Sequence, residues 1–399
     1  NGVKTDYTYD AAGKLLRVTS AAGTSAASTV THAWQGTDVV ETVYRAANEV
    51  AFARVNYAYF TSGPAYGLLA SETWTDLRTG AQRSSSYGYS FYSNNTVATM
   101  SVTRLLPGGN AMTTYAYDTL GHLTAVTDPL GQRIVWSNHN GLGLPGRRVD
   151  ANGVATDYAY DPKGNLVSTT QHLANGQRMT SFAYNNNRQV TDIAHASGRV
   201  ERFRYNAALK LEQAGNALGE FVRRDFDVGT NTATIRSNRH TPSLSGSTPV
   251  AVAAGEFVAR TRFDLVRRPG VHSGSGGQQA RLGYDNNGNL KTRTDAAGRI
   301  TLYDYDAQNR PIKATAPDGG ATLFGYDAEG RLAWVQDPRG LRTTFTYNGL
   351  GQVLARMSPD TGSTTYTYDT AGRLATETRA DGVTVAYAWD ALDRLRSRT

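Results

Sequence analysis

The chain has 399 residues, with 41 Lys and Arg against 34 Asp and Glu, which gives a formal net charge of +7. The basic residues are spread along the sequence, which argues against a nucleic-acid-binding stripe, and no apolar run approaches the ~20 residues of a membrane-spanning helix. The chain has no cysteine, so disulfides contribute nothing to its stability, and its 41 Gly and 12 Pro suit a turn-rich β protein. Because it begins at Asn1 and not at Met, we expect it to be part of a longer protein.

Residues 1–19 contain one unit of a repeat. Tyr7 and Tyr9 alternate with polar residues, which is the period of a β-strand with one covered face, and Asp10 to Gly13 follow as a turn. In residues 20–110 the repeat is degenerate, although β-branched and aromatic residues still alternate with polar ones. We expect the same kind of sheet there, with longer strands and irregular loops.

Regular repeats occupy residues 111–399. The last seven units place an aromatic residue every 21 positions, and two of them read Tyr-Asp-x-x-Gly-Arg-Leu, at Tyr326 and Tyr368. This self-similarity predicts an array that grows by addition of similar units. Between Phe226 and Phe263 the spacing widens to 37, so we expect an inserted loop at about residues 229–255. No stretch reads as a domain linker, and we expect one array over residues 1–399.

Each unit is predicted to be a β-hairpin closed by a turn. Asp369 opens a type I turn in which its carboxylate can accept backbone N–H groups, and Gly372 tolerates the positive φ that follows. Fourteen such anchors predict ~28 strands, and strand twist predicts a spiralling antiparallel sheet. The residues expected to carry the structural motif are Tyr9, Asp10, Gly13, Tyr117, Asp118, Gly121, Tyr160, Asp161, Gly164, Tyr284, Asp285, Gly288, Tyr326, Asp327, Gly330, Tyr368, Asp369 and Gly372.

The recurring polar residues are better explained by structure than by catalysis. Catalytic carboxylates are few and distinct, whereas these Asp residues recur in one role. The letters Gly141-x-Gly143-x-x-Gly146 match a dinucleotide fingerprint, but Pro145 and the repeat register argue against the helix that phosphate binding needs. The seven His residues lack paired ligand spacing, and the ladder positions of the tyrosines favour packing over sugar stacking. We therefore expect no catalytic residue, no cofactor and no metal.

The Tyr-Asp-x-x-Gly-Arg-Leu units and the Asp-Pro-x-Gly spacers at Asp128 and Asp337 resemble the YD repeats of Rhs proteins. Similar repeats occur in the C component of insecticidal Tc toxins and in teneurins. The resemblance covers residues 112–399 and 1–19, and it implies an all-β fold in which a long antiparallel sheet spirals into a hollow shell. In bacterial polymorphic toxins that shell encloses a C-terminal toxin.

The resemblance implies a structural, non-enzymatic shell segment of an Rhs-type polymorphic toxin, exported from a bacterial cytoplasm and secreted or held at the cell surface. Its partners would be the C-terminal toxin domain of the parent protein and secretion-apparatus or adaptor proteins. Autoproteolysis is not implied, because Asp337 to Leu341 match only the short part of the family's self-cleaving signature. We expect that core and the toxin to lie beyond Thr399. The alternative is a cell-surface adhesion or carbohydrate-binding array.

Overall fold

The computed structural model describes residues 4–25, 27–106, 109–238 and 257–399. Within these ranges the regular elements are 34 β-strands, and within each of the two compact units described below consecutive strands pair antiparallel, as β1 (Thr5–Tyr9) does with β2 (Leu15–Ser20). The predicted all-β antiparallel fold class is therefore confirmed. None of the described residues forms a helix long and apolar enough to cross a membrane.

The chain folds into two compact units. The first comprises Asn1–Arg133, Asp285–Asn289 and Leu302–Thr399, and the second comprises Ile134–Tyr284 and Leu290–Thr301. The N-terminal part of the first unit continues from β2 with β3 (Ser28–Gln35), β4 (Asp38–Arg45), β5 (Ala51–Tyr59), β6 (Leu69–Asp76), β7 (Gln82–Phe91), β8 (Val97–Leu106), β9 (Gly109–Tyr117) and β10 (Leu123–Thr127).

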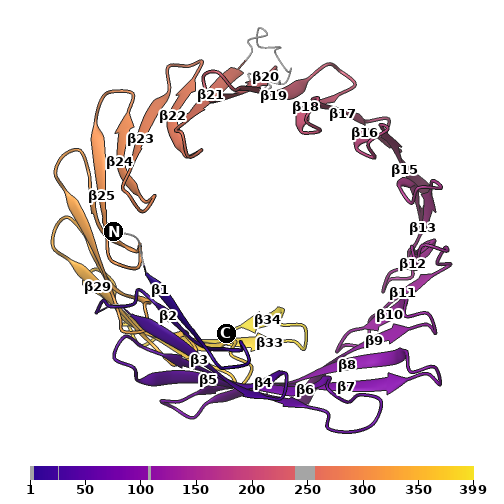
Figure 1. Ribbon diagram of the computed structural model, residues 1–399, viewed down its shortest axis with the longest axis horizontal. Helices are drawn as coiled ribbons and strands as arrows, with labels where there is room; N and C mark the ends of the chain where they lie inside the picture. The colour runs from indigo at the N-terminus through magenta and orange to yellow at the C-terminus, as the bar shows by residue number, and fades with distance from the viewer. Residues whose placement is uncertain (1–3, 26, 107–108, 239–256) are drawn as a thin grey trace. The chain divides into compact units, whose positions relative to one another are not determined.

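The second unit is a run of hairpins, which follow one another along the sheet in Figure 1. Its strands are β11 (Arg133–Ser137), β12 (Arg147–Val149), β13 (Ala155–Tyr160), β14 (Leu166–Leu173), β15 (Gly176–Tyr184), β16 (Val190–His195), β17 (Val200–Tyr205), β18 (Leu211–Asn216), β19 (Phe221–Asp227), β20 (Thr232–Ser237), β21 (Phe257–Phe263), β22 (Pro269–Gly274), β23 (Gln279–Tyr284) and β24 (Leu290–Asp295).

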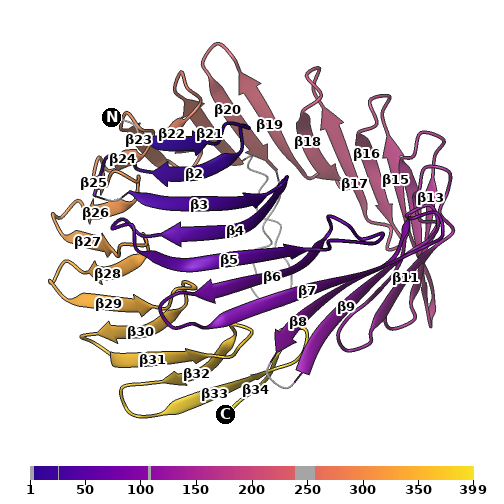
Figure 2. The same ribbon diagram turned by 60° about the horizontal axis from the view of Figure 1, so that its bottom comes forward.

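The C-terminal repeats supply the rest of the first unit. They form β25 (Ile300–Tyr305), β26 (Pro311–Thr315), β27 (Ala321–Tyr326), β28 (Leu332–Gln336), β29 (Arg342–Tyr347), β30 (Val353–Ser358), β31 (Gly362–Tyr368), β32 (Leu374–Thr378), β33 (Thr384–Trp389) and β34 (Leu395–Arg398). Figure 2 shows the regular alternation of strand and turn in this part of the chain.

The structure has more strands than the ~28 that the fourteen anchors predict, and the additional strands lie in the degenerate region of residues 20–110. There β3 to β8 are eight to ten residues long, against five to seven in β27 to β33, as the blurred rhythm of residues 20–110 predicts. The best-buried core of the first unit also lies here, since Ala53 and Val55 of β5 and Thr42 and Val43 of β4 are all buried. The longer strands therefore bury apolar side chains more completely than the short repeats do.

The prediction of an inserted loop at about residues 229–255 is wrong for residues 232–237. Thr232–Ser237 is the strand β20, which pairs with β19 on one side and β21 on the other. Thr232, Thr234 and Ile235 are β-branched and favour a pleated strand over a loop. The remainder of the expected insertion, residues 239–255, lies outside the described residues.

Candidate functional site

The repeat motif builds each turn around one carboxylate. Oδ1 of Asp369 accepts the N–H of Ala371 at 2.9 Å and the N–H of Arg373 at 2.8 Å. The N–H of Gly372 donates to the Asp369 carbonyl at 2.9 Å, and its φ of +82° is the left-handed conformation that glycine tolerates. The same roles fall to Asp10, Asp118, Asp161, Asp285 and Asp327, and to Gly13, Gly121, Gly164, Gly288 and Gly330.

The tyrosine of the motif ties each unit to the one before it. Tyr368 ends β31, and its hydroxyl donates to the carbonyl of Val353, 15 residues earlier, at 2.8 Å. The same bond is made by Tyr160 to Pro145, by Tyr284 to Pro269 and by Tyr326 to Pro311. Two predicted tyrosines differ, because the Tyr117 carbonyl accepts a bond from the Tyr92 hydroxyl and the Tyr9 side chain is exposed.

The arginine that follows the glycine has a role that sequence reasoning missed. Nε of Arg331 donates to Oδ2 of Asp327 at 2.7 Å, and Nη1 donates to the carbonyl of Asn348 at 2.7 Å. Its guanidinium also lies 4.7 Å from the centre of the Tyr347 ring. One side chain thus joins its own turn to the next unit. The sequence signal that could have revealed this role is the recurrence of arginine at this place in the repeat. The same bond to the turn Asp is made by Arg268, Arg299, Arg310, Arg373 and Arg394.

Hydrogen bonds of this kind favour the ionised form of two turn carboxylates, Asp306 and Asp390. Burial opposes ionisation of Asp306, but hydrogen bonds from Arg310 and from the Gln308 N–H outweigh it and hold the pKa of Asp306 below its usual value. At Asp390, the backbone N–H and the guanidinium of Arg394 lower the pKa of the carboxyl. A general base needs a pKa near the working pH, so these carboxylates are suited to fixing turn geometry and poorly suited to proton transfer.

We expect Arg331→Ala to destabilise its repeat by about 1–3 kcal/mol, because it removes charge-assisted bonds to two turns. The matched control is Arg299→Ala, since Arg299 makes the same bond to Asp295 but its side chain is 69% exposed. That change should cost less than about 0.5 kcal/mol. Backbone hydrogen exchange over β28 and β29, and over β24 for the control, measures both. Equal protection losses would contradict the bridging role of Arg331.

In the first unit, the turns of the last repeats contact the N-terminal strands, as Figure 2 shows for β3 to β8 beside β27 to β33. The Ala47 N–H donates to the Ala328 carbonyl at 2.9 Å, and Gly349, 21 residues after Ala328, donates to Asp76. Two ion pairs lie along the same line, Arg78 with Glu329 at 3.3 Å and Arg104 with Asp393 at 2.6 Å. We call this line of contacts the seam.

Asp76 is the most buried carboxylate of the seam, with none of its surface exposed. Its Oδ2 accepts the Gly349 N–H at 2.7 Å, and its Oδ1 accepts the Arg78 N–H at 2.9 Å. Burial opposes ionisation, but these bonds and those from Thr79 outweigh it, and the pKa of Asp76 lies below its usual value. Sequence reasoning did not single out Asp76, because Gly349 is 273 residues away.

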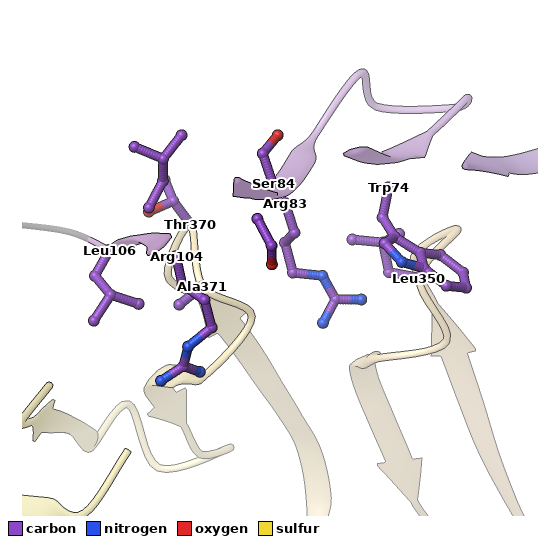
Figure 3. A pocket seen from close by; sticks show the side chains of 10 residues that line it. Trp74, Arg83, Ser84, Arg104, Leu106, Leu350, Thr370 and Ala371 are labelled. Carbon is purple, nitrogen blue, oxygen red and sulfur yellow. The ribbon is translucent and has the colours of Figure 1, made fainter. Parts of the chain in front are cut away.

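A cavity of about 450 Å³ lies at the seam (Figure 3). The side chain of Arg83 points between Leu350 and Ala371, and the guanidinium of Arg104 lies beside Ala371. Trp74 and Leu106 add apolar surface, and the described lining residues include no carboxylate and no imidazole. The cavity therefore holds no acid–base pair of its own.

Two family models match parts of the chain. The Teneurin YD-shell model matches residues 267–397, and the RHS repeat model matches residues 102–133 and 139–178. The resemblance to Rhs and other YD-repeat proteins is thereby confirmed, and it falls on the regular repeats. No curated protein sequence matches the chain.

Solved structures of Tc toxin assemblies share the fold. The crystal structure of TcdB2-TccC3-Cdc42 matches with a TM-score of 0.72 at 14% identity, covering 98% of this chain and 23% of the other. A Tc holotoxin pore from Photorhabdus luminescens matches with a TM-score of 0.72 at 15% identity, with the same coverage of both chains. The crystal structure of TcdB2-TccC3 gives a TM-score of 0.59 at 15% identity, covering 98% and 25%. The chain thus spans about a quarter of the length of these relatives.

Proposed function

We propose that this chain is a structural, non-enzymatic shell segment of an Rhs-type polymorphic toxin, which encloses a toxin domain carried further along the parent protein. The proposal rests on one observation, which is that the recurrent polar side chains of the motif are engaged in structural hydrogen bonds. The Asp carboxylate, the Tyr hydroxyl and the Arg guanidinium of the motif are bonded within a repeat or between neighbouring repeats. The match of residues 267–397 to the Teneurin YD-shell model supports the same reading.

The proposal includes one array over residues 1–399, with the eighteen motif residues as its structural elements and with no catalytic residue, cofactor or metal. The parent protein would leave a bacterial cytoplasm and act outside the cell or at its surface. Its partners would be its own downstream toxin domain and proteins of an export apparatus. The solved relatives are Tc toxin assemblies, which supports a partner of the toxin class.

Limited proteolysis of the parent protein tests enclosure. We expect the downstream segment to resist added protease while the shell is intact, because paired strands offer few accessible backbone sites. Mass spectrometry of the products gives its half-life, and the same segment expressed alone is the control. If the segment is digested at equal rates in the two forms, enclosure is rejected. That result would not change the assignment of the fold.

A further inference from the structure

Arg83 lines the cavity at the seam, which we call the seam cavity, and its charge has no partner in the described part of the chain. Three arginines among the described residues have a buried Nε without a hydrogen bond, namely Arg54, Arg83 and Arg356. Nη1 of Arg54 nevertheless lies 3.6 Å from Glu41, and Nη2 of Arg356 contacts the Thr364 hydroxyl at 3.5 Å. No hydrogen bond or ion pair joins Arg83 to a described residue. Because a partly buried charge without a partner is unfavourable, folding alone does not explain its position.

The register of the sheet places the polar lining of the seam cavity on one face. Arg83 of β7 lies opposite Trp74 of β6, and Ser85 of β7 lies opposite Arg104 of β8. Arg83 and Ser85 point to the same side, because alternate side chains of a strand share a face. Arg104 is already paired with Asp393 at 2.6 Å, so Arg83 supplies the positive charge of the cavity that remains uncompensated.

The rest of the lining comes from the turns of two C-terminal repeats. Leu350 lies in the turn between β29 and β30, and Thr370 and Ala371 lie in the turn between β31 and β32. Figure 3 shows the Arg83 side chain between Leu350 and Ala371. A methyl group on Gly372 would lie 2.7 Å from Nη1 of Arg83, so the guanidinium lies close to the second of these turns. A group bound to Arg83 would therefore contact both sides of the seam.

The carboxylates that belong to this part of the seam are bonded elsewhere. Asp369 accepts two backbone N–H groups of its own turn and Nε of Arg373. Asp76 is fully buried and accepts the Gly349 N–H. Neither carboxylate forms an ion pair with Arg83, and the described lining residues of the cavity include no other acid. An anion from solution is therefore the partner that the geometry leaves for Arg83.

We propose that the seam cavity binds a small organic acid, with its carboxylate on Arg83 and its apolar body against Trp74 and Leu106. A guanidinium can bind a carboxylate through two parallel N–H···O bonds, and the planar fork of arginine suits that geometry. The indole ring and the leucines of the lining favour an aromatic or aliphatic body over a purely polar anion. The volume of about 450 Å³ lies in the range of small-ligand sites. The assignment goes beyond the shell role and is independent of it.

Calorimetric titration of the chain with benzoate and with naphthoate tests the assignment. Naphthamide serves as the neutral probe of the same shape, and inorganic phosphate serves as an anion without an apolar body. We expect at least one of the two acids to bind, and we expect naphthamide and phosphate to bind more weakly than that acid. Arg83→Gln should weaken the acid by about tenfold or more, as loss of a charge-assisted bond does. The control is Arg133→Gln, which removes an exposed arginine outside the cavity lining and should leave binding unchanged.

The stability of Arg83→Gln separates a binding role from a structural one. Because the substitution removes an unpaired charge, the urea midpoint of the variant should equal or exceed that of the wild-type chain. The bound acid should also slow hydrogen exchange at the Gly349 amide of the wild-type chain, since it contacts both sides of the seam.

Five results would each overturn the proposal. Four come from the titrations: neither acid binds, naphthamide binds as tightly as the acids, phosphate binds more tightly than both, or Arg83→Gln and Arg133→Gln have equal effects. The fifth is a lower urea midpoint for Arg83→Gln, which would assign Arg83 to the fold. None of these outcomes bears on enclosure, which is tested on the parent protein.

Discussion

Gly349→Ala should weaken the seam by about 2–4 kcal/mol. A methyl group on Gly349 would overlap the carboxylate of Asp76 and lie 2.5 Å from the carbonyl oxygen of Phe52. Both obstacles are poorly able to move, since one is backbone and the other is a fully buried side chain. The turn must therefore withdraw, and the bond from the Gly349 N–H to Asp76 is lost with it.

The chain contains a matched control for this change. Asn140-Gly141-Leu142-Gly143 has the same four letters as Asn348-Gly349-Leu350-Gly351, and neither Gly141 nor Gly349 has a left-handed φ. A methyl group on Gly141 would meet nothing within 4 Å, so Gly141→Ala should be nearly neutral. Hydrogen exchange at the Ala47 and Gly349 amides reports on the seam. Unchanged exchange in Gly349→Ala would show that the seam does not confine this turn.

The repeat unit could be predicted from sequence because its interactions are local. The Asp369 carboxylate reaches only to Ala371 and Arg373, and the Tyr368 bond spans 15 residues, less than one period. Spacing and residue type therefore determine strand, turn and glycine. The role of Arg331 rests on the same periodicity, but it requires the next repeat to be placed in space before the carbonyl of Asn348 can be recognised as its partner.

The seam could not be predicted in this way. The identical turns at Gly141 and Gly349 have different surroundings, and only Gly349 meets a strand more than 270 residues away, so its local sequence carries no sign of the contact. β20 is missed for a different reason. Its β-branched residues favour a strand, but the widened spacing between Phe226 and Phe263 predicts an inserted loop at about residues 229–255, a range that includes β20.

Asp76→Ala should cost the seam about 3 kcal/mol, because it leaves the N–H groups of Gly349 and Arg78 without their buried acceptor. Asp76→Asn should cost less, since the amide oxygen can still accept one of these bonds while the charge is gone. Denaturant unfolding of the two variants and the wild-type chain measures the order. Equal midpoints for all three would mean that the carboxylate contributes nothing to the seam.

The contribution of Asp76 should also depend on pH in a defined direction. Its pKa in the folded chain is lower than in the unfolded chain, so its stabilisation is fully present above the unfolded value of about 4 and is lost as pH falls through the folded value. Other turn carboxylates with lowered pKa values, such as Asp118 and Asp306, also contribute less to the stability of the folded chain in acid. The difference between the wild-type chain and Asp76→Asn cancels that shared loss. We expect this difference to be constant near neutral pH and to narrow below about pH 4, and a difference that stays constant throughout the acid range would contradict an ionised Asp76.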